Sequence, residues 1–276
     1  MNEKECEECR ALAKEIRKHV LRMVCAGKSG HIGSMLSTAD IYPVLYKRIL
    51  KVDPSRPKWP ERDRFLLSKG HGGAALLACL AECGFFPLGW LDRYYCDDGI
   101  LSGHISHHVP GVEFSTGSLG HGLPVACGMA MAAKRDGAKH RIFVMSSDGD
   151  LNEGSTWEAI MLAGQHHYDN LTMIVDYNRL QALGSSEDII DLEPLGPKLE
   201  MFGWKTAEAD GHDPQAIEAA LSHLPLEGGK PSCVIFRTVK GKGVSFMEHN
   251  NAWHKGVPND EQYKIACAEL EALINE

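Results

Sequence analysis

Two groups of polar residues each follow a short apolar segment and could together bind a cation. Asp148 and Gly149 follow Ser147 after the largely apolar residues 141–146, and Asn178 follows a second apolar segment at 171–176. Carboxylate and amide oxygens are ligands that Mg²⁺ and Ca²⁺ prefer, and with one backbone carbonyl they leave positions open for phosphate oxygens. Gly149 lets the backbone approach a phosphate, and a helix that begins there adds amide donors. The pattern predicts a site for a divalent cation and a phosphate group.

The spacing of these residues makes the prediction more specific than either residue alone. Asp-Gly by itself is a common turn sequence. About 30 residues separate Asp148 from Asn178, however, which is the length of a strand–helix–strand unit. Such a unit brings both side chains to the same end of neighbouring parallel strands, where ligands bind in open α/β sheets. The loops after Ser68, Ser147 and Asp176 are therefore expected to carry the chemistry.

The elements that must position these loops alternate along the chain. Apolar residues at helical spacing and short apolar runs predict an α/β fold, with helices sandwiching a largely parallel sheet. A Pro-rich turn is expected at 53–60. The expected helices lie at 12–24, 37–48, 72–83, 120–134, 155–168, 214–224 and 260–273, and the expected strands at 65–68, 141–146, 171–176, 204–207 and 232–237.

Further segments give the sequence a family resemblance. The stretch from Ser147 to Asn178 resembles the thiamine-diphosphate motif, which begins Gly-Asp-Gly and ends in Asn, although Ser147 replaces the first glycine. Other segments resemble motifs of the transketolase family, in the family's order: Ser29-Gly30-His31-Ile32-Gly33, Leu67-Ser68-Lys69-Gly70-His71, Gly103-His104, Val109-Pro110-Gly111-Val112-Glu113, Ser115-Thr116-Gly117-Ser118-Leu119-Gly120-His121-Gly122 and Trp253-His254. The resemblance covers nearly the whole chain and implies the fold of the family's thiamine-diphosphate-binding (PP) domain.

The resemblance also implies a role for each matched position. Asp148, Asn178 and the Leu180 carbonyl would hold the metal, Mg²⁺ or Ca²⁺. The residues implied to contact thiamine diphosphate are His71, Gly117, Ser118, Leu119, Gly149, Glu153, Asn178 and His254. Glu153 resembles an acidic residue that lies at the family's subunit interface. The implied catalytic residues, which would bind sugar hydroxyls and move protons, are His31, His71, His104 and His254, and histidine suits proton transfer because its ordinary pKa lies near neutral pH.

Some features depart from the family pattern or have other interpretations. Ala182-Leu183-Gly184 stands where the family commonly has a large apolar residue, Asp and Gly, so that part of the cofactor loop is expected to be reshaped. His121 is expected to line the loop. His107 and His108 could suggest zinc, but no acidic or cysteine partner has suitable spacing. The other histidines, His212 among them, are interpreted as surface or structural residues.

The residues that activate the cofactor have no counterpart in this sequence. In the family, the glutamate that faces the aminopyrimidine, the stacking aromatic residues and the arginines for sugar phosphate lie in later domains. We therefore expect residues 1–276 to form one PP-type domain, with the pyrimidine-binding and C-terminal domains on a partner chain. The resemblance implies the N-terminal subunit of a split transketolase, assembled as α₂β₂. It would transfer a two-carbon ketol (glycolaldehyde) unit from a ketose phosphate to an aldose phosphate.

Three alternatives remain open from the sequence. The chain could be half of another thiamine-diphosphate enzyme, such as a specialised-sugar transketolase, a deoxyxylulose-phosphate-synthase-like enzyme or a 2-oxo acid dehydrogenase. The histidine set favours sugar hydroxyls over 2-oxo acids. A non-catalytic scaffold subunit of the same fold is the second alternative, and the retained histidines argue against it. A metal-dependent phosphate-ester hydrolase is the third, but no second carboxylate cluster is evident.

Composition and charge narrow the remaining classes of protein. The chain has 276 residues and a net charge of −8, which argues against a nucleic-acid-binding protein. No apolar run approaches the roughly 18–20 residues that a membrane span needs, so no membrane partner is expected. The polar N-terminus is unlike a secretory signal, and nine scattered cysteines suit reduced thiols, so a cytoplasmic location is expected. Cys6 and Cys9 form a CxxC pair, but no second pair completes a zinc site.

Overall fold

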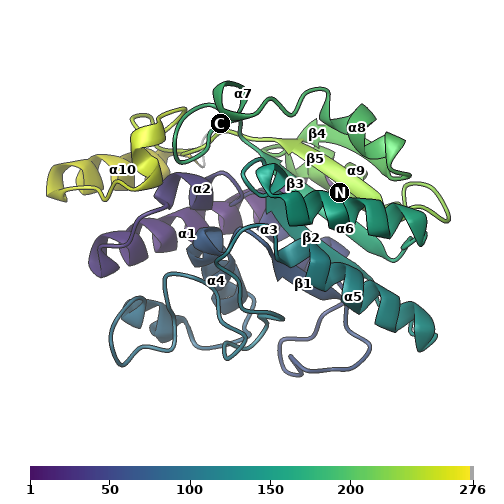
Figure 1. Cartoon of the computed structure of the whole chain (residues 1–276). Helices are drawn as coiled ribbons and strands as arrows, with labels where there is room; N and C mark the ends of the chain where they lie inside the picture. Colours follow the sequence, from purple (N-terminus) through teal and green to yellow (C-terminus); the bar gives the residue numbers. More distant parts are fainter. Residues whose placement is uncertain (274–276) are drawn as a thin grey trace.

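The structure is a computed structural model that describes residues 1–273, so the last three residues of the expected 1–276 domain lie outside it. Its centre is one sheet of five parallel strands in the order β1-β2-β3-β5-β4 (Figure 1). The strands are β1 (Arg64–Leu67), β2 (Ile142–Ser147), β3 (Leu171–Tyr177), β4 (Lys205–Asp210) and β5 (Ser232–Arg237). Ser147 pairs with Asp176, so β2 and β3 end side by side.

Helices cover both faces of this sheet (Figure 1). One face carries α1 (Glu3–Gly27), α2 (Ile32–Leu36), α3 (Ile41–Val44), α4 (Gly73–Glu82), α9 (Pro214–Leu221) and α10 (Asp260–Ala272). The other carries α5 (Gly122–Arg135), α6 (Gly154–Gln165) and α8 (Leu195–Met201), while α7 (Ser186–Ile189) lies in the loop after β3. No helix among residues 1–273 is both long and apolar enough to cross a membrane.

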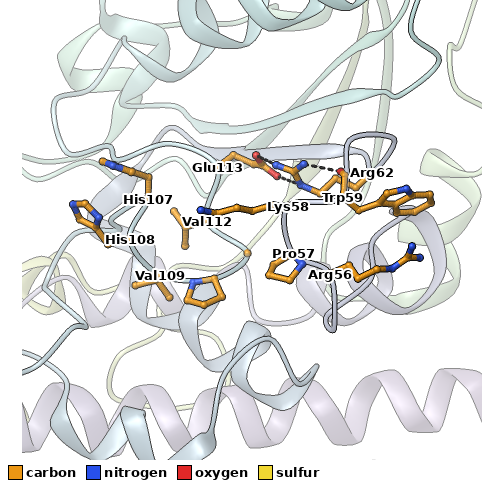
Figure 2. Close-up of a pocket in the computed structure, with 12 residues that line it drawn as sticks. Arg56, Pro57, Lys58, Trp59, Arg62, His107, His108, Val109, Val112 and Glu113 are labelled. Carbon is orange, nitrogen blue, oxygen red and sulfur yellow. Dashed lines mark hydrogen bonds and ion pairs between the residues drawn. The ribbon is translucent and has the colours of Figure 1, made fainter.

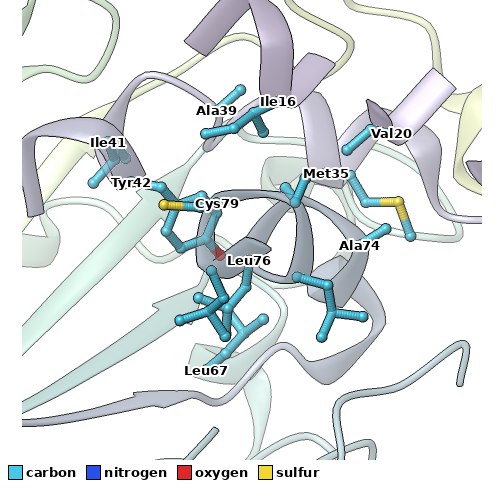
Figure 3. Close-up of a cluster of buried hydrophobic side chains, with 14 of the residues drawn as sticks. Ile16, Val20, Met35, Ala39, Ile41, Tyr42, Leu67, Ala74, Leu76 and Cys79 are labelled. Carbon is cyan, nitrogen blue, oxygen red and sulfur yellow. The ribbon is translucent and has the colours of Figure 1, made fainter. Parts of the chain in front are cut away.

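The hydrophobic core is divided into two clusters by the sheet. Successive side chains of a strand point to opposite faces. Phe143 and Met145 of β2 accordingly belong to the cluster that includes α1 and α4, whereas Ile142 and Val144 belong to the cluster that includes α5 and α6. Figure 3 shows the first cluster, in which the small residues of α4 let this helix lie between the sheet and α1. This two-sided burial fixes the strand ends that carry the polar loops.

Most predicted elements are confirmed, with one clear correction. The helix expected at 37–48 begins earlier and is divided into α2, α3 and a short wide turn at Leu45–Ile49. No new helix begins at Ser37, whose hydroxyl donates to the Ser34 carbonyl and to the Asp176 carboxylate. Two short helices, α7 and α8, were not predicted, and α7 depends on a cap in which the Ser185 side chain accepts from an amide of its first turn.

Gly164 gives a test of how closely α6 and α8 pack. A Cβ at Gly164 would lie 1.7 Å from the Phe202 carbonyl oxygen at the end of α8, so the backbone would have to move. We expect Gly164→Ala to destabilise the protein by about 2 kcal/mol or more, measured by thermal unfolding. Gly128→Ala in α5 is the matched control, because a Cβ there meets nothing within 4 Å and should stabilise the helix by about 0.5–1 kcal/mol. Equal effects of the two substitutions would contradict this packing.

Candidate active site

A cavity of about 270 Å³ lies at the carboxyl edge of the sheet. The loops after β1, β2 and β3 line it as expected, and the loop after β5 joins them. Its lining residues are His31, Ser34, Lys69, His71, His104, Gly117, Leu119, Ser147, Asp148, Gly149, Asp176, Asn178, Leu180, Gln181, Ala182, Lys240 and His254. The fold therefore brings together chemistry-bearing residues that are far apart in the sequence.

Asp176, near the end of β3, forms the floor of this cavity. Its carboxylate accepts hydrogen bonds from Lys69 Nζ (2.5 Å), Ser37 Oγ (2.7 Å), Asn178 Nδ2 (3.1 Å) and Thr238 Oγ1. Burial alone would raise the pKa of Asp176, but the Lys69 ammonium and these donors hold the pKa below its usual value. Asp176 is therefore a carboxylate, and it joins the loops that follow β1, β3 and β5.

Lys69 completes this arrangement from the loop after β1. The Lys69 and Asp176 side chains are both 0% exposed, and Lys69 Nζ also donates to the Ser34 carbonyl at 2.7 Å. Removing one partner of a buried ion pair leaves an uncompensated charge and typically costs about 3–5 kcal/mol. The pair therefore strongly restricts where the first loop can lie.

Asp148, Asn178 and Leu180 supply oxygen donors that fit a hard cation. The Asn178 side-chain nitrogen donates a hydrogen bond to Asp176, which fixes the orientation of the amide. Its Oδ1 is therefore the acceptor end, and it accepts from the Leu180 N–H at 3.1 Å. Asp148 accepts from Ser186 Oγ at 2.7 Å. Burial raises the pKa of Asp148 to about 6, and a divalent cation would offset this by its charge. One carboxylate, one amide and one backbone carbonyl match the preference of Mg²⁺ for oxygen ligands.

This donor set relies on amide and backbone oxygens rather than on clustered acids. Within residues 1–273, no three His, Cys, Asp or Glu side chains are grouped closely enough to hold a metal ion. A search of the sequence for carboxylate or His–Cys clusters would therefore miss the site. The position of Asn178 at a strand end is the signal that identifies it.

The loop that carries Gly117 is anchored to the sheet by close packing. Thr116 Oγ1 donates to the Leu67 carbonyl at 2.6 Å, and a Cβ at Gly70 would lie 2.6 Å from atoms of Thr116. The Gly120 N–H donates to Asp150 Oδ1 at 2.9 Å. Burial raises the pKa of Asp150 to about 6. Gly70 and Asp150 were not predicted as site residues, yet they hold this wall of the cavity in place.

Four histidines face one another in the cavity. The ring centroid of His31 lies 5.1 Å from the centroids of His71 and His254, and 6.1 Å from that of His104. Burial lowers the pKa of His71 to about 2 and that of His254 to about 4, and it also lowers the pKa of His31. These three rings are therefore neutral near pH 7. A neutral imidazole has one N–H donor and one acceptor nitrogen, which suits sugar hydroxyls.

The backbone of His31 is part of this arrangement. His31 has a φ of 73°, in the left-handed region, and its N–H donates to the His254 carbonyl at 2.7 Å. Non-glycine residues held in this region are uncommon and often lie at functional sites. The contact joins the start of α2 to the segment that carries His254.

Lys240 is the most important residue that sequence reasoning missed. Its Nζ donates to the carbonyls of Leu180 (3.0 Å) and Gln181 (3.3 Å) and to Nδ1 of His254 (3.0 Å). Burial lowers the pKa of Lys240 to about 8. Because the ammonium donates to Nδ1, the neutral His254 ring carries its hydrogen on Nε2. The available signal was its place in the loop directly after the strand predicted at 232–237.

Several predicted residues lie outside the cavity. Ser118 and Glu153 are exposed and do not line it, and His121 is exposed with its Nδ1 near the Leu119 carbonyl (2.9 Å). In the reshaped segment, Ala182 lines the cavity, whereas Leu183 is 90% exposed.

His107 and His108 belong to a separate surface hollow of about 980 Å³. Figure 2 shows the two rings on one side of this hollow and the Arg62–Glu113 ion pair on the other. The ring centroids of the two histidines lie 4.2 Å apart. They are therefore not part of the four-histidine cluster.

Comparison with known proteins agrees with this geometry. The family described as "Transketolase, thiamine diphosphate binding domain" matches residues 9–268. The chain is 43% identical to one of the subunits of the apulose-4-phosphate transketolase of Actinobacillus succinogenes, over 96% of each chain. It is 42% identical to 6-deoxy-6-sulfo-D-fructose transketolase subunit SqwG of a Clostridium species, over 94% of each.

Solved transketolases have the same fold. The transketolase of Campylobacter jejuni is 31% identical with a TM-score of 0.90, and that of Leishmania mexicana is 30% identical with a TM-score of 0.89. The similarity covers 100% and 97% of this chain but only 44% and 42% of those chains, so it spans less than half of each solved protein. The family match and the relatives agree, and the chain belongs to the transketolase family as its thiamine-diphosphate-binding domain.

Proposed function

We propose that this chain is the thiamine-diphosphate-binding subunit of a split transketolase. The enzyme would transfer a two-carbon ketol unit from a ketose phosphate to an aldose phosphate. The observation that carries the proposal is one cavity that places four histidines beside the oxygen donors Asp148 and Asn178. Relatives whose names make them single subunits of a transketolase, and which match over nearly their full length, support a two-chain enzyme.

The residues present fit the cofactor's diphosphate and its metal. Asp148, Asn178 and the Leu180 carbonyl would hold Mg²⁺, while His71, His254 and the Gly149 amide would contact the diphosphate. Thiamine diphosphate, when bound, supplies the electron sink for cleavage of the carbon–carbon bond. The Lys240 ammonium adds positive charge to the wall, which favours an anionic ligand, whereas the Lys69 ammonium is paired with Asp176.

The chain's own histidines would orient the sugar and exchange protons with it. His31, His71 and His254 are neutral near pH 7 because burial lowers their pKa values. His31 and His71 can each donate to one hydroxyl and accept from another, whereas His254, whose Nδ1 accepts from Lys240, can donate from Nε2. His104 lies at the exposed end of the cluster and would meet the donor ketose first. Holding the sugar in one geometry lowers the entropic part of the barrier.

The partner would complete the site. We propose that residues 1–276 form one PP-type domain and that a C-terminal subunit supplies the pyrimidine-binding domain and the phosphate-binding groups, in an α₂β₂ assembly. A specialised-sugar transketolase is the second candidate. It is favoured by relatives that are named for apulose 4-phosphate and 6-deoxy-6-sulfo-D-fructose.

Reconstitution tests the proposed activity. We expect the purified chain alone to show no ketol transfer, and a complex with a C-terminal transketolase subunit to show it when thiamine diphosphate and Mg²⁺ are added. The donors to compare are a pentulose phosphate, apulose 4-phosphate and 6-deoxy-6-sulfo-D-fructose, with products separated by chromatography. Full activity of the lone chain would contradict the split enzyme, and a preference among donors would decide between the two candidates.

The metal site can be tested without activity. Asp148→Ala removes the only carboxylate among the three oxygen donors, so we expect Mg²⁺-dependent binding of thiamine diphosphate to weaken at least about tenfold by calorimetry on the complex. Glu187→Gln is the matched control, because this exposed carboxylate lies in the neighbouring loop after β3 but outside the cavity. Unchanged affinity in the Asp148 variant would exclude it as a ligand.

His104 gives a separate test of sugar binding. We expect His104→Ala to lower kcat/KM for the donor ketose about 10²-fold while leaving thiamine diphosphate affinity unchanged, because the ring lies at the open end of the cluster. His107→Ala in the neighbouring hollow should leave donor kinetics unchanged. If both variants behave alike, His104 does not face the donor.

A further inference from the structure

We propose that Arg17, Asp40 and His212 form a buried positioning relay for Lys240. These three residues lie outside the cavity, yet their hydrogen bonds end on the backbone segment 239–242 that carries Lys240. The inference rests on the proposed function only in so far as Lys240 serves the cofactor site. It assigns a role to His212, which the sequence suggested to be merely structural.

The relay begins with an ion pair between Arg17 of α1 and Asp40, which directly precedes α3. Arg17 donates from Nη1 to Asp40 Oδ1 (2.9 Å) and from Nη2 to Asp40 Oδ2 (2.5 Å), while its Nε donates to the Lys242 carbonyl at 3.0 Å. Both side chains are buried. Burial alone would raise the pKa of Asp40, but Arg17 and His212 hold the pKa well below its usual range. Asp40 is therefore a carboxylate that must keep its donors.

His212 connects Asp40 to the backbone of Val239 through hydrogen bonds. Its Nδ1 lies 2.7 Å from Asp40 Oδ2, and its Nε2 lies 2.8 Å from the backbone nitrogen of Val239. A backbone N–H can only donate, so Nε2 must be the accepting nitrogen and Nδ1 must carry the hydrogen given to Asp40. A doubly protonated ring would place two N–H groups against each other. The geometry thus requires one neutral tautomer of His212.

The constraint reaches Lys240 because its backbone has little freedom. Val239 precedes Lys240 directly, and the Gly241 N–H donates to the Gly33 carbonyl at 2.9 Å. A Cβ at Gly33 would lie 3.1 Å from Lys240 Cγ, so the side chain runs through a narrow passage to His254. A shift of the backbone therefore moves the ammonium, and with it the bond that sets the tautomer of His254.

The polar relay is not needed for packing alone. A buried ion pair contributes little net stability compared with well-packed apolar side chains of similar volume. Residues that orient a site residue, by contrast, typically change ligand affinity about 10–100-fold when they are substituted. The hydrogen bonds of the relay end on the backbone on either side of Lys240, which favours a role in positioning Lys240.

Three substitutions at the relay test this inference. His212→Leu removes both hydrogen bonds, whereas His212→Gln can donate to Asp40 and accept from Val239. Asp40→Asn is the milder variant should His212→Leu fail to fold. The first readout is the ¹⁵N chemical shifts of the His254 ring in the full chain without cofactor, with Lys240→Met as the reference for a lost lysine contact. The second is thiamine diphosphate affinity of the complex, measured by calorimetry with Mg²⁺.

We expect His212→Leu to shift the His254 signals toward those of Lys240→Met and to weaken cofactor binding about tenfold. His212→Gln should retain both properties, and Asp40→Asn should lie between. A lower unfolding temperature with unchanged His254 signals in His212→Leu, or in Asp40→Asn if only that variant folds, would show a purely structural role and overturn the inference. Absence of cofactor binding by the unmodified complex would instead count against the proposed function, because the His254 signals are measured without cofactor.

Discussion

One ion pair that is shielded from water, between Lys69 and Asp176, determines how the carboxyl edge of this sheet is assembled. An ammonium or carboxylate left alone in such a place is very costly, so the two must meet. Their meeting fixes the loop after β1 against the end of β3, and Thr238 extends the contact to β5. The cavity exists because three loops converge on a single carboxylate.

The electrostatic character of the cavity follows from the ion pair between Asp176 and Lys69. Asp176 is already neutralised by Lys69, so it adds little negative charge to the site. Buried histidines with lowered pKa values add no positive charge at neutral pH, which leaves Lys240 as the cation that faces the oxygen donors. A site of this kind suits a ligand that carries negative charge at one end and hydroxyl groups at the other.

The sequence allowed prediction of the sheet and of half of the cavity. Asp148 and Asn178 could be found because each follows a short apolar run, and the histidines because they lie in segments similar to known motifs. Lys69 and Lys240 could not, since a lysine in a loop ordinarily lies in water and its burial depends on partners far away in the chain. The helix start expected at 37 was wrong for the same reason, because the partner of Ser37, Asp176, lies far away in the chain on β3.

The two walls of the cavity differ in how freely their sequence can vary. A side chain at Gly70 would collide with Thr116, so the wall that carries Gly117 is tied to the core of the fold. At Gly184 a Cβ would meet nothing within 4 Å, and the adjoining Ala182 and Leu183 are exposed. Substitutions at 182–184 can therefore alter the shape of the cavity at little cost in folding free energy. This segment gives the fold a place where the shape of the cavity can evolve while the buried ion pair and the anchored glycine loop stay the same.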